Sequence, residues 1–397
     1  MAIETTSTLS NARWAKYIPD YIRGAMFGRV YDHYSSPVGR DMSNLKRGSS
    51  VVVNFLQDMP LGTETISEVS DVTPTVLGDA TQSISPTSRW GLLQVSERML
   101  NEASTNYAAE RFYTVGKNAA ESIDLLAQAQ ATQGSQVSRS SARASLDAGT
   151  AADLLTADKI AYAEADLQTL KVPSFVDAGR PMWVATMHPY AFADLRADTR
   201  IVATGEYQKA NIILKHELGE LGPFKLQVTP WAKTFWSAGA DNASSVATTV
   251  STAVSALDKT FVVAANTNMA VGGWLSVGSE ETADTHYETN ERVRIVGISG
   301  TTITIAGEGA NGGFRFDHAA SVAVRNADSV GTVVFGGPMS MAKLYDTSVG
   351  EFGQVVGPKK GGALDQFDSL GWKFYGDYKR MIESWLLREE VAFGREA

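Results

Sequence analysis

A glycine-rich motif is the first feature whose residue types and spacing could bind a ligand. Residues 307–312 (Gly-Glu-Gly-Ala-Asn-Gly) match G-x-G-x-x-G, a pattern that binds dinucleotides when it joins a strand to a helix. Here a short predicted strand precedes the motif, but residues 313–316 (Gly-Phe-Arg-Phe) predict another strand instead of the helix that would bind the pyrophosphate. We therefore interpret the motif as a glycine turn in a β-rich region.

The histidines and acidic residues offer one further candidate for chemistry. No histidine belongs to a H-E-x-x-H zinc motif. Asp284, His286 and Glu288 alternate, so an extended backbone would place all three on one side, where a cation could bind. Nothing else in the sequence completes such a site, so we favour a solvated acidic loop and expect neither a metal nor a cofactor. His188 precedes a proline, which is more typical of a helix start than of a catalyst.

The composition excludes several classes of protein. The 397 residues are 44% hydrophobic and include no cysteine, which rules out disulfide scaffolds, thiol nucleophiles and cysteine-based zinc sites. The net charge of −9 argues against a globally basic nucleic-acid-binding protein. The N-terminal sequence is polar and no apolar run reaches ~18 residues, so we expect a soluble protein without a secretion signal. No catalytic constellation emerges, and we predict that the chain is not an enzyme.

The elements that position these residues begin with a basic N-terminal arm. Residues 1–47 hold seven basic and four acidic residues, and aromatic side chains are scattered through them. Such a segment cannot form its own core, so its apolar side chains need a partner surface, and another subunit is one candidate. Its charge would also allow weak, non-specific phosphate binding. We favour pairing with acidic neighbours in an assembly.

A long hairpin is predicted next. Residues 49–59 alternate as a strand, and residues 89–97 predict a second one. Between them lies a polar stretch, residues 60–86, which contains four acidic residues and no basic one. A connection of this length exceeds ordinary loops, and such loops are usually functional or disordered.

Helix and strand patterns then alternate. Residues 106–132 carry one apolar stripe at three- and four-residue steps and predict a helix roughly 40 Å long. A helix capped by Thr156, a buried strand at 181–187, a helix after His188 and a strand at 223–229 form a compact αβ unit.

Residues 238–329 change character and predict a small all-β insert. They contain ten acidic and five basic residues, with no helical period. Short strands are predicted at 260–264, 292–298, 301–306 and 321–325.

The last part of the chain returns to the main domain. We predict a strand at 332–335, a flexible turn at 357–362, an alternating strand at 370–379 and a final strand over 381–393. We expect the strand at 51–55, the αβ unit and these last strands to share one sheet region, with the insert as a side domain.

The order of these elements resembles the major capsid proteins of tailed phages with the Hong Kong 97 fold. Residues 183–198, with a strand, His188-Pro189 and Asp194-Leu-Arg196, are similar to one coat-protein subfamily, as is the Gly-x-x-Gly turn at 219–222 with its following strand. The insert resembles small β-barrel modules of phage structural proteins. The resemblance implies an α+β fold with these parts: an N-terminal arm (1–47), an extended hairpin loop (48–105), a spine helix with its linker (106–146), a peripheral and axial αβ core (147–237), an inserted β domain (238–329) and a return to the core (330–397).

The resemblance also implies a function. It points to a structural protein whose pentamers and hexamers form an icosahedral head, found in the virion and assembled in the bacterial cytoplasm. The implied partners are other copies of the chain, non-specifically packaged double-stranded DNA, and portal, scaffolding or decoration proteins, with no membrane. Residues expected to contribute to assembly are Trp14, Tyr17, Tyr21, Phe27, Arg29, Tyr31, Glu64, Glu68, Asp71, Arg89 and Trp90.

Two other interpretations stay open at this stage. An encapsulin-like nanocompartment would have the same fold, with a cargo-binding groove and no DNA. A β-rich ligand-binding or adhesin-like protein would instead use the insert, with a cation at Asp284 and Glu288. The missing paired-carboxylate motif and the missing export signal count against this second alternative.

One departure from the family pattern concerns lysine. Some relatives cross-link covalently through a lysine on the extended loop, but this sequence has no lysine between Lys46 and Lys117. That chemistry should be absent from the loop, so the strength of a shell must come from non-covalent contacts.

Overall fold

The computed structural model describes most of the chain as two compact units. Unit 1 comprises residues 1–29, 36–123 and 342–381, and unit 2 comprises residues 30–35, 124–341 and 382–397. Within them the described residues are 18–27, 29–37, 50–56, 59, 61–63, 65, 78–102, 107–146, 149–177, 179–201, 219–236, 246–279, 288–309, 311–325, 329–346, 350–362 and 366–396.

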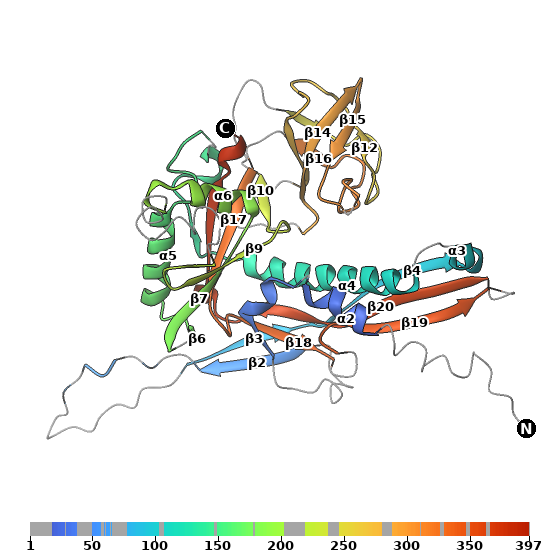
Figure 1. Cartoon of the computed structure of the whole chain (residues 1–397). Helices are drawn as coiled ribbons and strands as arrows, with labels where there is room; N and C mark the ends of the chain where they lie inside the picture. Colours follow the sequence, from blue (N-terminus) through green and yellow to red (C-terminus); the bar gives the residue numbers. More distant parts are fainter. Residues whose placement is uncertain are drawn as a thin grey trace, which may run out of the picture. The chain divides into compact units, whose positions relative to one another are not determined.

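Unit 1 is built on a five-stranded sheet and a two-stranded ribbon (Figure 1). In the sheet the order is β1-β18-β20-β19, and β4 pairs with the long strand β20; β2 and β3 form the ribbon. The elements are α2 (Ile18–Phe27), β1 (Ser35–Pro37), β2 (Val51–Leu56), β3 (Asp79–Ile84), β4 (Thr87–Ser96), α3 (Glu97–Glu102), β18 (Met341–Tyr345), β19 (Gln354–Gly361) and β20 (Phe367–Arg380).

The longest helix, α4 (Tyr107–Thr132), runs from unit 1 into unit 2. The apolar stripe expected from the sequence is buried along its whole length, which confirms the prediction of this helix. Its buried members are Phe112, Val115, Ala119, Ile123, Leu126 and Ala129. Within unit 1, α4 lies along β4 and β20 (Figure 1) and covers one face of that sheet.

The core of unit 2 is an eight-stranded sheet with helices. Its order is β5-β21-β17-β7-β9-β8, with β10 on β17 and β6 on β7. Strands β7 and β9 are parallel, and the connection between them includes α6. The elements are β5 (Val137–Ser138), α5 (Ala157–Thr169), β6 (Phe175–Asp177), β7 (Arg180–Met187), α6 (Pro189–Ala197), β8 (Glu220–Leu221), β9 (Phe224–Val228), β10 (Thr234–Trp236), β17 (Ser329–Gly336) and β21 (Leu386–Ala392).

Both helices of this αβ core begin as the sequence predicts. The hydroxyl of Thr156 accepts a hydrogen bond from the backbone N–H of Lys159 and caps α5. The Nδ1 atom of His188 accepts one from the N–H of Tyr190, and Pro189 occupies the first position of α6. The His-Pro pair therefore starts a helix, as expected.

The insert forms a six-stranded sheet around its own hydrophobic core. Its strand order is β11-β16-β13-β14-β15-β12, and the core includes Phe261, Val293 and Phe314. The strands are β11 (Ala247–Thr249), β12 (Thr260–Val262), β13 (Trp274–Gly278), β14 (Glu291–Ser299), β15 (Thr302–Ala306) and β16 (Ala323–Arg325). The sequence did not predict β11 and β13.

Two predictions about strand pairing are wrong. The strand at 51–56 pairs with β3, not with the strand at 87–96, which pairs with β20 instead. Because the ribbon is exposed on one side, β3 has a polar sequence and gave no apolar alternation to detect. The expected single sheet region is also wrong, since β2, β20 and β21 belong to three different sheets.

Two local predictions are wrong as well. Residues 357–362, expected to form a flexible turn, lie largely in β19, where a register shift between Val356 and Lys359 accommodates Gly357 at φ 99°. Residues 313–316 do not form a strand; Phe314 instead packs into the core of the insert. A chain that mixes helices and strands in this way confirms the α+β class. Among the helices in the described ranges, none has both the length and the apolar character needed to cross a membrane.

Gly116, in the interior of α4, allows α2 to approach closely. A Cβ atom at this position would clash with the backbone carbonyl of Tyr21. We expect Gly116→Ala to lower the free energy of unfolding by about 1–3 kcal/mol, although alanine favours an isolated helix over glycine by about 1 kcal/mol. Urea denaturation followed by circular dichroism measures this change.

Thr114→Ala is the matched control, because Thr114 is exposed on the same helix. It should change the stability by no more than about 0.5 kcal/mol. A stabilised Gly116→Ala variant would contradict the packing of α2 against α4.

Candidate functional site

One face of the unit 1 sheet carries large, exposed apolar side chains. In the antiparallel pairing of β4 with β20, Trp90 lies opposite Lys373, and Leu92 lies opposite Gly371. Directly paired residues project to the same side of a sheet, and so does every second residue along each strand. Trp90 is 74% exposed and Leu92 64%. Together with the exposed rings of Phe367 and Tyr375 on the same side of β20, they form what we call the open sheet face.

The opposite face of this sheet is covered by α4. The indole N–H of Trp372 donates to the side-chain oxygen of Asn118 at 2.9 Å. Arg111, buried on α4, pairs with Asp368 on β20 at 2.8 Å. Helix α4 therefore covers one side of the sheet, and the open sheet face is exposed to solvent. Large exposed apolar side chains gathered on one face in this way are typical of an interaction surface.

Two of the predicted arm residues are buried within unit 1. The hydroxyl of Tyr21 donates to the backbone carbonyl of Phe352 at 2.9 Å. The guanidinium of Arg29 lies 3.3 Å from the carboxylate of Glu351, donates to the hydroxyl of Tyr378 at 3.1 Å, and stacks 5.0 Å from the ring of Phe352. Both side chains are thus covered by their own chain and not by a partner surface.

Tyr31 is buried in unit 2 in a similar way. Its backbone N–H and that of Val30 both donate to the carboxylate of Asp124, at 2.8 Å each. Its ring lies 6.4 Å from that of Tyr34, whose hydroxyl donates to the carbonyl of Val334 at 2.8 Å. An assembly role for Tyr21, Arg29 and Tyr31 stays a prediction.

Of the remaining predicted assembly residues, three lie in the described part of the chain and five lie outside it. Arg89 is partly buried on the helix-covered side of β4, opposite Phe374, whereas Trp90 is on the open sheet face. Phe27 ends α2. The others lie outside the described residues: Trp14, Tyr17, Glu64, Glu68 and Asp71.

Sequence reasoning missed three members of the open sheet face: Leu92, Phe367 and Tyr375. Leu92 has the same parity as Trp90 within the predicted strand at 89–97, so alternation alone could have placed it beside the tryptophan. Phe367 and Tyr375 join them only through the register of β20 on β4, which no local pattern encodes.

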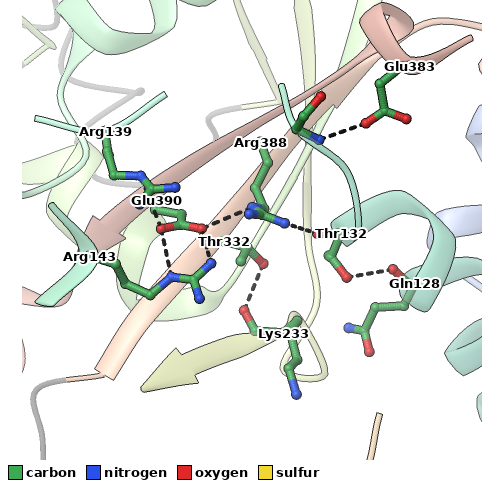
Figure 2. A network of polar contacts seen from close by, with 10 residues as sticks. Gln128, Thr132, Arg139, Arg143, Lys233, Thr332, Glu383, Arg388 and Glu390 are labelled. Atoms are coloured by element: carbon green, nitrogen blue, oxygen red, sulfur yellow. Dashed lines mark hydrogen bonds and ion pairs between the residues drawn. The ribbon is translucent and has the colours of Figure 1, made fainter. Parts of the chain in front are cut away.

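A buried network of charges fixes the core of unit 2 (Figure 2). The carboxylate of Glu390, on β21, is fully buried and lies within 4 Å of three arginines. Arg143 approaches it at 2.5 Å, Arg388 at 3.0 Å and Arg139 at 3.6 Å. Arg388 also donates to the carbonyl of Thr132 in the last turn of α4. The network therefore joins the end of α4, β21 and the segment around Arg143.

The described residues form no recognisable catalytic or metal site. No group of three or more potential metal ligands occurs within the described ranges. Burial, together with the nearby charge of Arg292, lowers the pKa of His188 to about 3, so its ring is neutral at physiological pH. The glycine motif is a closed turn, in which the N–H of Gly307 donates to the carbonyl of Gly312 at 2.8 Å. Asp284 and His286 lie outside the described residues.

Solved structures of other proteins share the fold of this chain. The sequence matches no model of a protein family and no curated protein. Among solved structures, the capsid of cyanophage P-SCSP1u has a TM-score of 0.53 at 8% identity, covering 92% of this chain and 88% of that one. The capsid asymmetric unit of cyanophage Pam1 has a TM-score of 0.52 at 12% identity, covering 99% and 94%.

A structure from Mycobacterium phage Che8 is also similar. Its TM-score is 0.50 at 10% identity, and the match covers 91% of this chain and 90% of that chain. The resemblance inferred from the sequence is thus supported at the level of the fold: the chain has the fold of bacteriophage capsid proteins along about nine-tenths of its length.

The buried network yields a prediction about stability. Glu390→Gln would leave Arg143 and Arg388 without their buried carboxylate, so we expect it to lower the free energy of unfolding by about 3–5 kcal/mol. Chemical denaturation measures the effect.

Glu102→Gln serves as the exposed counterpart. Glu102 pairs with Arg98 at 2.7 Å, but both side chains are largely in solvent. Its loss should cost no more than about 0.5 kcal/mol. Equal effects of the two substitutions would show that the buried network does not stabilise unit 2.

Proposed function

We propose that the chain is the major capsid protein of a tailed, double-stranded DNA bacteriophage. Many copies, arranged as pentamers and hexamers, would form an icosahedral head that encloses the genome. The observation that carries this proposal is the fold, which extends along almost the whole chain and is similar to those of two phage capsids. The role is structural, and no enzymatic step is part of it.

The open sheet face supports the proposal that the protein works by assembling with other copies of itself. An isolated copy leaves Trp90 and Leu92 in water, and burying such side chains contributes about 1.5–3 kcal/mol each. A neighbouring copy can supply the cover that α4 supplies on the other side of the sheet. The acidic stretch at 60–86 is a candidate for this contact, because Lys373 is exposed on the open sheet face. Closed symmetric shells repeat one such contact many times.

Charge supports an orientation of the chain in the shell. Residues 1–47 are basic, and the insert at 238–329 is acidic. We propose that the arm lines the interior, where it meets packaged DNA without sequence preference, and that the insert faces outward. Portal, scaffolding or decoration proteins are the expected further partners. The location would be the virion, after assembly in the bacterial cytoplasm.

Electron microscopy of purified particles tests this proposal. The proposal requires closed shells with the insert on the outer surface, and nucleic acid in heads from infected cells. Shells that hold a cargo enzyme in place of DNA would support the encapsulin-like alternative. A small soluble species on size-exclusion chromatography would contradict both.

Replacing the two central residues of the open sheet face should prevent assembly. We expect Trp90→Ser combined with Leu92→Ser to abolish shells while the subunit stays folded, because both side chains are already exposed in the isolated chain. Size-exclusion chromatography and negative-stain microscopy measure assembly, and circular dichroism checks the fold.

Tyr162→Ser is the matched control, since Tyr162 is an exposed aromatic residue on α5, 72% exposed, outside the open sheet face. It should assemble normally. Normal shells from the double variant would contradict a role of the open sheet face in assembly.

The absence of lysine between Lys46 and Lys117 gives a further prediction. If assembled particles are boiled in detergent, we expect a single monomer band on a denaturing gel, because the loop lacks the lysine through which some relatives cross-link. A ladder of covalent oligomers would overturn this expectation.

A further inference from the structure

The insert and the αβ core of unit 2 meet at the first residues of β14. Arg292 is 2% exposed, and its guanidinium lies 3.7 Å from the ring centroid of Trp274, which belongs to the insert. On the other side the same guanidinium lies 5.3 Å from the ring of Tyr190 and 5.4 Å from that of Phe393, both of the core. A planar guanidinium binds aromatic faces well, and more strongly when it is removed from water. Arg292 therefore contacts aromatic rings on both sides of the junction.

Further contacts cross the junction nearby. The guanidinium of Arg315, in the insert, lies 4.3 Å from the ring of Trp231, in the core. The ammonium of Lys233, in the core, donates to the backbone carbonyl of Asn290 at 3.5 Å. The insert is thus held by side chains, in addition to the two connections of the chain itself.

Within the insert, the carboxylate of Glu291 forms hydrogen bonds next to the two arginines. The carboxylate of Glu291 accepts hydrogen bonds from the backbone N–H of Arg315 at 2.7 Å and of Phe316 at 3.0 Å. It also lies 2.8 Å from Nε2 of His318, and both of these side chains are buried. The Glu291 carboxylate therefore holds the backbone at Arg315, and Arg292 follows Glu291 directly along β14.

We propose that Arg292 and Arg315 form a clamp that fixes the orientation of the insert on the αβ core. This device goes beyond the proposed function, because it concerns how one copy is arranged and does not require a shell.

Distance measurements between two spin labels test the clamp in the full chain. Because the sequence has no cysteine, Tyr162→Cys on α5 and Thr301→Cys in the insert, both at exposed positions, can be labelled selectively. Labelled chains are diluted with an excess of unlabelled wild-type chains, so that only distances within one copy are measured. We expect one narrow distance distribution, and its loss in Arg292→Met and in Tyr190→Leu.

Arg294→Met is the matched control, because Arg294 is on the same strand but is exposed and donates to the carbonyl of Gly272, within the insert. It should keep the narrow distribution. Tyr190→Leu alters only the core side of the clamp, so it distinguishes loss of docking from unfolding of the insert. A broad distribution in the unsubstituted chain, or a narrow one in both clamp variants, would overturn the clamp.

Discussion

One helix covers only one face of a sheet, and much of this structure depends on that constraint. In unit 1, α4 covers the face of β4 and β20 that carries Trp372, and the buried pair of Arg111 with Asp368 sets its position. Gly116 lets α2 approach the same helix. No described element of unit 1 does the same for the open sheet face, so its exposure follows directly from how the covered face is built.

The sequence predicted elements with a strong local period and missed those without one. The stripe of α4, the Thr156 cap and the alternation of β20 depend on residues that are neighbours along the chain, and each was found. Strand pairing depends on residues far apart. The polar sequence of β3 gave no sign that it pairs with β2, and the glycines of residues 357–362 are typical of turns although they lie at a bulge.

The residues of the candidate site could likewise be predicted only where they belong to a local pattern. Trp90 could be named from the sequence because it stands in an alternating strand. Phe367 and Tyr375 could not, because their place beside it depends on a register between segments far apart in the chain. Aromatic residues of the arm were equally visible in the sequence, yet Tyr21 and Tyr31 are buried by their own chain. Residue type alone therefore does not distinguish an aromatic side chain that is buried in the core of its own chain from one that stays exposed on the surface.

Exposed apolar side chains on the open sheet face carry a free-energy cost, which the proposed assembly would offset. In the described part of the chain, β4 pairs only with β20, so its outer edge also lacks a partner strand. Exposed edges with apolar side chains favour uncontrolled association, and a charge on the same face, such as Lys373, weakens it. The sequence has no cysteine and no lysine between Lys46 and Lys117, so we expect the contacts of that segment to be non-covalent. Under the proposed function, such contacts would dissociate and form again, so a misplaced copy would leave before a closed, symmetric shell traps it.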